Sequence, residues 1–405
     1  MKILYLSNMC SEDIQQEIFR EKVPALNLAA QKFHRLLCRG LSSFSPEVEL
    51  ECLSVFPSTN RKVVYSRKEK KNEIAYHYLG YLNIPIVKHL QIVFMTFAIM
   101  CAWWLRNRKK QKILICDLLN CSLSSSALLF SKLFRVKVVT IITDLPKMMS
   151  MFRVHEEQVS KLAKTASVIS EKLMSYYDGY VLLTEQMNSW ANPRQHPYII
   201  IEGIADHCTA PAIPEETFGN KKNIIYAGGL FSTYGVTELL WGFMAAPELD
   251  LELHLYGQGP LTTDFIPDCC QKDQRIKYWG VVDNQVIMQH LRKAFLIVNP
   301  RSASGEFTKY SFPSKNMEAM SSGVPFLAVK LPGIPNEYQP FFYTLKEATV
   351  DNIQLMLRKI YAESPEKRQA MGRAARQFVL TQKNEKVQAE KLLTLIAKIL
   401  DNKKK

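Results

Sequence analysis

Apolar runs of strand length alternate with helix-length amphipathic stretches along most of the chain. In the first half, the strand-length runs are Lys2–Leu6, Val48–Ser54, Ile74–Leu82, Ile113–Asp117, Lys137–Thr143, Gly179–Thr184 and Tyr198–Ile201. Stretches with helical character lie between them, as at Ala25–Gly40 and Leu123–Leu133. Buried strands that alternate with helices are typical of a parallel sheet covered by helices on both faces.

The alternation stops at residues 206–222, which are polar and rich in proline, as linkers between domains tend to be. It resumes with the strands Asn223–Tyr226, Glu252–Tyr256, Lys277–Tyr278, Phe295–Val298 and Pro325–Ala328. The expected fold class is therefore α/β, with two Rossmann-like, doubly wound parallel-sheet domains that face a cleft. We place these domains at residues 1–205 and 223–384, with a final helical segment at residues 385–405.

Composition supports two globular domains and points to an anionic partner. A chain of 405 residues with 47% apolar and 22% charged residues has enough material for two cores. The net charge of +14 is uneven, because residues 1–112 hold 18 Lys and Arg against 9 Asp and Glu. The densest basic clusters are Arg67, Lys68, Lys70, Lys71 and Arg106, Arg108, Lys109, Lys110, Lys112. Such patches attract nucleic acid or an anionic bilayer. Without a recognisable nucleic-acid module, we expect an anionic membrane surface and no nucleic acid.

The cysteines and the N-terminus favour a cytoplasmic protein. The cysteine residues are odd in number, nine, and form no C-x-x-C pair, which favours reduced thiols over a disulfide framework or a zinc site. The first apolar run, at Lys2–Leu6, is too short for a signal peptide. We therefore expect a cytoplasmic protein, peripheral on the inner face of the cell membrane.

The segment Leu90–Leu105 is 16 residues long, carries no charge and is followed at once by Arg106. A membrane-spanning helix needs about 20 such residues. Trp103 and Trp104 beside a basic run are typical of an interfacial anchor. A buried core helix, a helix lying in the bilayer interface and a spanning helix all remain open, in that order of preference.

Residues 301–325 hold the densest candidate chemistry. The strand Phe295–Val298 leads into a loop with the charged residues Arg301, Glu306, Lys309 and Lys315, and the loop enters a helix through Pro313 and Ser314. Cations and unpaired N–H groups at a helix N-terminus suit a phosphate. Glu318, on the first turns of that helix, is placed to accept both hydroxyls of a ribose. This combination predicts a site for a nucleoside diphosphate, although Pro and Ser at a helix start also serve as ordinary caps.

The string EFTKYSFPSKNMEAMSSGVPFLA resembles the nucleotide-sugar site of group 1 (family 4-like) glycosyltransferases of the GT-B fold, of the capsular or exopolysaccharide type. Three further segments match the family in order and spacing. They are the turn with Gly228 and Gly229, the strand end with Tyr256 and Gly257, and the strand end with Gly280 and Val281. The resemblance implies that these residues, with Arg301, Lys309, Ser314, Lys315 and Glu318, bind the donor, and that residues 385–405 cross back to the first domain.

Three donor-side positions depart from the family pattern. The family carries an Arg and a Lys that hold the donor pyrophosphate where this chain has Gly229 and Tyr234. Its second carboxylate, which touches the donor sugar, corresponds to Tyr310, and Glu306 on the same loop is the candidate replacement. We therefore expect Arg301, Lys309 and Lys315 to supply the phosphate-binding charge.

The first domain offers acceptor-side candidates at the ends of its strands. Thr143 and Asp144 end a buried strand at the edge where ligands bind in open α/β sheets. The family often has His-Asp there, and this chain has Thr143 in place of the His. Asp144 is a candidate base or orienting group, or else a turn cap. Asn8 and Asp117 follow other strands of that edge, whereas His34 is expected on a helix surface.

The resemblance implies a glycosyltransferase that moves a sugar from a nucleotide-sugar donor to a glycan or lipid-linked acceptor. It also implies retention of anomeric configuration and no cofactor or metal, and the sequence contains no D-x-D of the metal-binding type. Two alternatives remain open. One is a nucleotide-sugar epimerase of the same fold, and the other is a non-catalytic scaffold with a degenerate nucleotide site.

Overall fold

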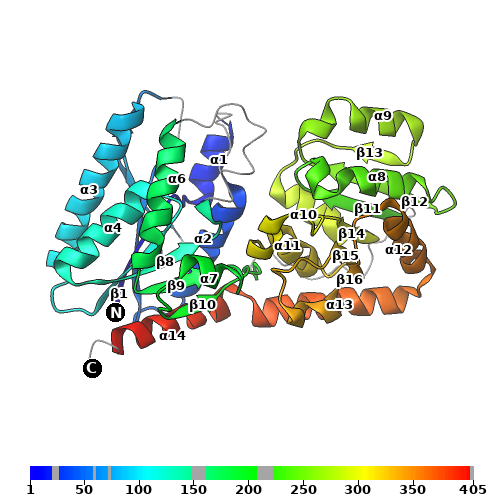
Figure 1. Cartoon of the computed structure of the whole chain (residues 1–405). Coiled ribbons are helices and arrows are strands. Elements are labelled where there is room, and N and C mark those ends of the chain that lie inside the picture. The colour runs from blue at the N-terminus through cyan, green and yellow to red at the C-terminus, as the bar shows by residue number, and fades with distance from the viewer. Residues whose placement is uncertain (21–26, 58–60, 72–73, 147–160, 208–221, 402–405) are drawn as a thin grey trace. The chain divides into compact units, whose positions relative to one another are not determined.

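A computed structural model gives the fold and describes residues 1–20, 27–57, 61–71, 74–146, 161–207 and 222–401. The chain forms two compact units, residues 1–204 with 385–405 (unit 1) and residues 205–384 (unit 2). The predicted linker, residues 206–222, lies mostly outside the described residues. Each unit is an α/β layer structure around its own sheet (Figure 1).

The main sheet of unit 1 has the order β10-β9-β8-β7-β1-β2-β5-β4. Its strands are β1 (Lys2–Ser7), β2 (Glu49–Val55), β4 (Arg67–Lys71), β5 (Ile74–Leu79), β7 (Lys112–Asp117), β8 (Lys137–Ile142), β9 (Gly179–Leu182) and β10 (Tyr198–Ile200). All neighbours are parallel except β4, which pairs antiparallel with β5. The order reverses between β1 and β7, which makes this the switch point of a doubly wound sheet.

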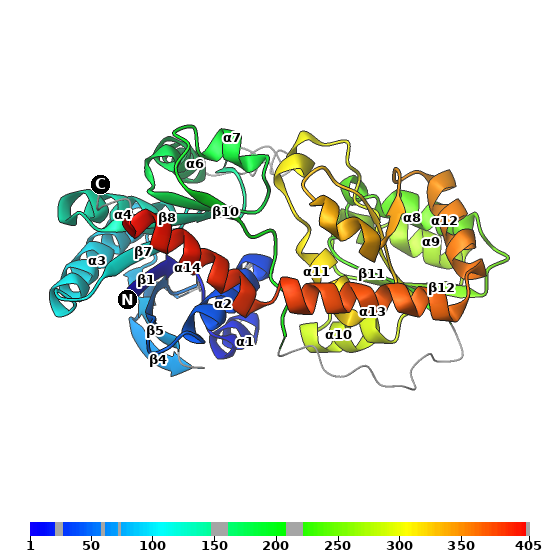
Figure 2. The same cartoon turned by 90° about the horizontal axis from the view of Figure 1, so that it is seen from below.

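Helices cover the sheet of unit 1 on two sides (Figure 2). They are α1 (Glu12–Arg20), α2 (Leu28–Ser42), α3 (Pro85–Arg106), α4 (Cys121–Phe134), α6 (Lys161–Leu173), α7 (Met187–Ala191) and α14 (Glu385–Asp401). The terminal helix α14 packs against α2, where a Cβ on Gly40 would lie 2.0 Å from the carbonyl oxygen of Glu385. The last helix of the chain thus completes the core of the first unit.

Unit 2 has a six-stranded, fully parallel sheet with the order β13-β12-β11-β14-β15-β16. Its strands are β11 (Lys222–Ala227), β12 (Leu251–Tyr256), β13 (Ile276–Tyr278), β14 (Leu296–Asn299), β15 (Phe326–Val329) and β16 (Tyr343–Leu345). Its helices are α8 (Val236–Met244), α9 (Phe265–Lys272), α10 (Asn284–Arg292), α11 (Ser314–Ser322), α12 (Val350–Ala362) and α13 (Pro365–Gln382). This is the Rossmann strand order, and its switch point lies between β11 and β14. The α/β fold class with parallel, Rossmann-like sheets is thus confirmed.

Three details differ from the sequence-based prediction. The predicted strand Ile74–Leu82 is split, because β5 ends at Leu79 and Tyr81–Leu82 (β6) pairs antiparallel with Val63–Val64 (β3). The basic segment Arg67–Lys71 was not predicted as a strand, and it forms the antiparallel edge strand β4. Its charged residues give no apolar alternation, so only its pairing with β5 reveals it.

The third difference concerns α3, for which a buried core helix was the favoured interpretation. Its buried positions form one stripe of Ile92, Thr96, Met100 and Trp103. Only 22% of its most apolar window is buried, so the core-helix interpretation is wrong. By length and composition alone, α3 is long and apolar enough to cross a membrane.

Candidate functional site

The candidate donor site is built at the switch point of unit 2, where β11 and β14 end beside the start of α11. Open α/β sheets bind ligands at this place because the loops that follow the two strands run to opposite faces of the sheet. Lys315 and Glu318 of α11 line a small cavity of about 20 Å³ together with Tyr226 and Ala227 of β11 and Asn299 of β14. The structure therefore brings the predicted cation and carboxylate together at the predicted sheet edge.

The N-terminus of α11 has no side-chain cap. Its N-cap is Pro313, which offers no side-chain acceptor to the first N–H groups of the helix. Ser314 and Lys315 are exposed, and Glu318 is half-buried. The side-chain amide of Asn299 donates to the side-chain oxygen of the buried Asn316 over 2.8 Å, which ties the end of β14 to α11. This leaves backbone donors of the positive end of the helix for a ligand.

Tight packing of glycine loops holds the edge formed by β11, β12 and β13. The N–H of Gly228 donates to the carbonyl of Tyr256 over 2.9 Å, and the N–H of Gly257 donates to that of Gly280 over 2.7 Å. A Cβ on Gly257 would lie 1.8 Å from the carbonyl oxygen of Gly228. Gly257 has φ +129° and Gly280 has φ +69°, conformations that favour glycine. Gly229 directly follows Gly228 in the chain. Its carbonyl accepts a hydrogen bond from the hydroxyl of Tyr226 over 2.7 Å.

An aromatic cluster lies beside these loops. The ring of Trp279 stacks on that of Tyr256 with a centroid distance of 6.4 Å, and Trp279 is 53% exposed. The Tyr256 hydroxyl pairs with Nδ1 of His290 over 2.5 Å. Burial raises the pKa of Tyr256 to about 12, and burial, with His254 and Lys293, lowers the pKa of His290. Both groups are thus neutral at physiological pH. Val281, the residue after Gly280, is also exposed.

Arg301 is positioned by two aromatic rings. Its guanidinium carbon lies 5.1 Å from the ring centroids of Tyr234 and of Phe307. Gly235, the N-cap of α8, is pressed against this loop, because a Cβ there would lie 2.2 Å from the carbonyl oxygen of Pro300. The loop after β14 therefore holds Arg301 at the start of α8, beside Tyr234, where this chain lacks the Lys of the family pattern.

Glu306 and Lys309 lie in the 3₁₀ turn Glu306–Tyr310, and both side chains are exposed. Thr308 anchors the turn, because its buried hydroxyl donates to the carbonyl of Gly305 over 2.6 Å. The two charged residues thus share the loop with Arg301, but they lie outside the small cavity that Lys315 and Glu318 line.

In unit 1, the corresponding edge carries the acceptor-side candidates. Asp144 is half-buried and directly follows Thr143, which is buried at the end of β8. At the switch point between β1 and β7, the side-chain amide of Asn120 donates to the side-chain oxygen of Asn8. Sequence reasoning missed Asn120, and its place three residues after the strand end at Asp117 was the available signal.

His34 was expected on a helix surface and is buried instead. Its Nδ1 pairs with the hydroxyl of Tyr5 over 2.6 Å, and its Nε2 lies 3.6 Å from a carboxylate oxygen of Asp117. The surface assignment is wrong because α2 turns this face toward the sheet. No group of three or more His, Cys, Asp or Glu side chains suited to a metal ion occurs among the described residues.

A family model matches most of the second unit. Residues 221–358 match the family model of group 1 glycosyl transferases. A comparison of the sequence with curated proteins finds no match.

Solved structures share the fold over almost the whole chain. Sucrose-phosphate synthase from Thermosynechococcus elongatus is 13% identical, covers 99% of this chain and 100% of its own, and has a TM-score of 0.65. A lipopolysaccharide outer core galactosyltransferase is 13% identical with a TM-score of 0.59, covering 98% of this chain and 99% of its own. The Anabaena protein HepE in complex with UDP is 13% identical with a TM-score of 0.59, covering 99% and 100%. The fold is thus that of GT-B glycosyltransferases, and with the group 1 domain it marks the protein as a glycosyltransferase enzyme.

Proposed function

We propose that the protein transfers a sugar from a nucleoside-diphosphate sugar to a hydroxyl group of a glycan acceptor, with unit 2 as the donor-binding unit. The observation that carries this proposal is the uncapped N-terminus of α11 at the switch point, where Lys315 and Glu318 line one cavity with the ends of β11 and β14. The positive end of a helix, a cation and a carboxylate match the diphosphate and the ribose hydroxyls of such a donor.

Each part of the donor has a partner in unit 2. The diphosphate lies at the N-terminus of α11, near Ser314, with Lys315 and the loop residues Lys309 and Arg301 as counter-charges. Glu318 accepts the ribose hydroxyls. Gly228 and Gly229 let the backbone approach the donor, because neither has a side chain in the way. The base is bordered by the exposed face of Trp279 and by Gly280 and Val281. These residues lie next to Tyr256 and Gly257.

Arg301 can replace one of the two phosphate-binding residues that the family has and this chain lacks. Tyr234 stands where the family carries a Lys, and the Arg301 guanidinium lies over the Tyr234 ring. A cation from the loop after β14 thus takes the place of one from the loop after β11. Arg301 also keeps its charge at any physiological pH, and its planar fork suits two phosphate oxygens.

The transfer itself needs stabilisation of the leaving diphosphate and a group for the acceptor proton. Helix N-termini and fixed cations stabilise developing negative charge in a water-poor site. We therefore propose transfer without added metal, and the resemblance to group 1 glycosyltransferases implies retention of configuration. Asp144 of unit 1 is the proposed base or orienting group for the acceptor hydroxyl, and Glu306 is the proposed carboxylate near the donor sugar.

Calorimetric titration with nucleoside diphosphates tests the donor site. UDP is the first ligand to try, because the similar Anabaena protein was solved with UDP. Heat of binding with UDP or GDP, and sugar transfer to an added acceptor, is the expected result. Conversion of the donor sugar without an acceptor would indicate an epimerase, and no heat with any diphosphate would indicate a scaffold.

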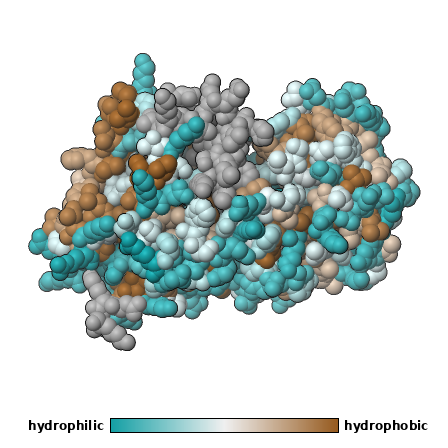
Figure 3. Space-filling view, in the orientation of Figure 1, coloured by the Kyte–Doolittle hydropathy of each residue, from teal (hydrophilic) through white to brown (hydrophobic). Residues whose placement is uncertain are grey.

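The acceptor is proposed to be lipid-linked, in surface polysaccharide assembly (capsule or exopolysaccharide), with unit 1 peripheral on the cytoplasmic face of the membrane. Supporting this, α3 exposes apolar residues along its outer side, among them Leu90 at 66% and Phe94 at 74%. Apolar residues gather over α3 in Figure 3. The neighbouring helix α4 adds exposed Leu129 and Leu133 to this surface. Exposed apolar patches of this kind mark protein or membrane contacts.

Charge and connectivity favour a helix that lies in the bilayer interface. The C-terminus of α3 carries Arg106 and leads to Arg108, Lys109 and Lys110, which suit anionic headgroups. Both flanking strands, β6 and β7, belong to unit 1, and the buried stripe of α3 packs within it. A spanning helix would have to give up these contacts, so we place α3 parallel to the membrane surface.

Replacing both Leu90 and Phe94 by Glu is expected to weaken binding to vesicles of equal parts phosphatidylglycerol and phosphatidylcholine by more than about tenfold. Burying such side chains contributes about 1.5–3 kcal/mol each. Flotation of protein with vesicles measures the effect. Leu355→Glu is the control, because Leu355 is also exposed, at 62%, but lies on α12 of unit 2. Equal vesicle binding by the double variant and the control would contradict membrane docking through α3.

A further inference from the structure

A groove on the sheet of unit 1 is not accounted for by sugar transfer. It has a volume of about 400 Å³ and is bordered by α3 on one side and β4 on the other. The register of the paired strands determines which residues form its floor. Leu4, Glu51, Ala75 and Lys70 form one row across β1, β2, β5 and β4, and Leu53, His77 and Lys68 form the next row.

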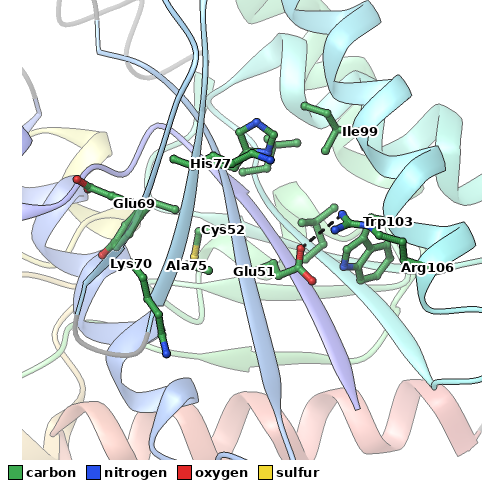
Figure 4. Close-up of a pocket in the computed structure, with 13 residues that line it drawn as sticks. Glu51, Cys52, Glu69, Lys70, Ala75, His77, Ile99, Trp103 and Arg106 are labelled. Carbon is green, nitrogen blue, oxygen red and sulfur yellow. Dashed lines mark ion pairs between the residues drawn. The ribbon is translucent and has the colours of Figure 1, made fainter.

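The groove exists because the sheet extends beyond its helical cover. Helix α3 lies over the middle of the sheet, and Figure 2 shows no labelled helix beyond it over β5 and β4 on that side. The unpredicted edge strand β4 widens the floor, since β5 would otherwise end the sheet. Ile99 and Trp103 project from α3 as an apolar wall (Figure 4), and they line the groove together with Leu53 and Ala75. Volumes of this size are typical of sites for small ligands.

The charges around the groove favour an anion. Glu51 is compensated by the ammonium of Lys2 at 3.3 Å and lies 3.9 Å from the Arg106 guanidinium. Glu69 and Lys70 also line the groove, and the Glu69 carboxylate accepts the hydroxyl of Tyr78 over 2.6 Å. Arg106, Lys68 and Lys70 therefore leave the groove positive. Burial lowers the pKa of His77, the charges of Lys68 and Arg106 lower it further, and the charge of Glu51 opposes them.

Trp103 provides a second, independent sign of a ligand. Its side chain is fully buried in the wall of the groove, yet its indole N–H donates to no acceptor among the described residues. An unpaired buried donor costs free energy, so an acceptor from a bound molecule would relieve that cost. The side chains of Trp103 and Arg106 project from α3 toward Glu51 (Figure 4). An acidic or ester head placed there would meet an N–H donor and a cation at once.

We propose that this groove binds one hydrocarbon chain of an anionic lipid along Leu53, Ala75 and Ile99, with the lipid head held by Lys68, Arg106 and the Trp103 N–H. The groove opens beside α3, whose outer side is the membrane-docking surface proposed above, so the lipid can enter from the bilayer. This inference rests on that docking but not on the transfer reaction.

The bound lipid is an anchor and not the sugar acceptor. The groove lies over the middle of β2, at Glu51–Leu53, and over the first residues of β5, at Ala75–His77. The acceptor-side residues Asn8 and Asp144 instead follow the carboxyl ends of β1 and β8. A lipid held in the groove would fix the orientation of unit 1 on the membrane, because α3 and the lipid head would both have to face the bilayer.

Binding of single-chain lipids below their micelle concentration tests the proposal on the whole chain. Lysophosphatidylglycerol is expected to bind about tenfold more tightly than zwitterionic lysophosphatidylcholine, and glycerol phosphate without a chain is expected not to bind. Ala75→Phe fills the floor at an exposed position and should weaken lysophosphatidylglycerol binding by at least about tenfold. UDP affinity and the melting temperature report separately on the donor site and on folding, and both should stay unchanged.

A matched pair on β4 tests the role of charge. Lys68 faces the groove, whereas Arg67 faces the other side of the sheet, where it pairs with Glu17 at 3.3 Å. Lys68→Ala should remove the preference for the anionic lipid, and Arg67→Ala should keep it. Equal effects of the two substitutions, or unchanged binding in Ala75→Phe, would overturn the proposal. So would a dimer of wild type that Ala75→Phe dissociates, because the occupant would then be a second copy of the chain.

Discussion

Replacing Glu318 by Ala is expected to weaken UDP binding on the order of 100-fold and to abolish sugar transfer at ordinary donor concentrations. Glu318 stands half-buried on α11 beside the cavity that Lys315 also lines. A carboxylate that accepts two ribose hydroxyls makes two hydrogen bonds of about 1.5–3 kcal/mol each, because hydrogen bonds to charged groups are the stronger kind. Loss of both corresponds to at least about two factors of ten in affinity. Isothermal titration calorimetry measures the change directly.

Two further variants separate this role from a general loss of charge. Glu318→Gln keeps one acceptor oxygen and should lose about tenfold in affinity, between wild type and Glu318→Ala. Glu347→Ala removes an exposed carboxylate elsewhere in unit 2 and should leave UDP affinity unchanged. Wild-type affinity in Glu318→Ala, with an unchanged melting temperature, would remove Glu318 from the donor site.

Replacing Gly257 by Ala is expected to destabilise unit 2 by about 3 kcal/mol or more and to eliminate UDP binding. The new methyl carbon would lie 1.8 Å from the carbonyl oxygen of Gly228, so one of the two loops must move. The backbone φ of +129° adds strain for any residue with a Cβ. For a domain of this size, such a loss lowers the melting temperature by about 6–12 °C. Differential scanning calorimetry follows the transition of unit 2.

Gly280→Ala is the matched control for this effect. Gly280 also has a positive φ, +69°, but a Cβ there would meet no atom within 4 Å. Only the cost of a left-handed backbone remains, about 1–2 kcal/mol. The difference between the two variants therefore measures the packing of the Gly228 and Gly257 loops. If both lower the melting temperature equally, the close approach of these loops does not stabilise unit 2.

The sequence pattern was sufficient for the α/β class and for the approximate positions of the strands in both units. Buried parallel strands read as continuous apolar runs, so Lys137–Thr143 and Phe295–Val298 agree with β8 and β14 to within a residue at each end. Loop glycines and a helix N-terminus are also local features of sequence. For this reason the turn at Gly228 and the start of α11 at Ser314 could be predicted.

Features that depend on contacts between distant residues could not be predicted. Strand β4 has no apolar alternation and is fixed by pairing Lys68 with His77 of β5. The exposure of α3 depends on which side of the sheet it crosses, and an apolar helix has the same composition in a core and at a membrane. Likewise, the position of Arg301 over Tyr234 arises from two loops that are far apart in sequence.

Hydrogen–deuterium exchange with and without UDP tests most directly whether the start of α11 holds a nucleoside diphosphate. Bound phosphate oxygens would accept the N–H groups of Ser314 and Lys315 at the uncapped start of the helix, so exchange at these two residues should slow when UDP is added. The N–H of Asn316 already donates to the carbonyl of Pro313 over 2.9 Å. The same peptides should show no slowing in Glu318→Ala at the same UDP concentration. UDP that binds while exchange at residues 314–318 stays unchanged would contradict the proposed donor site.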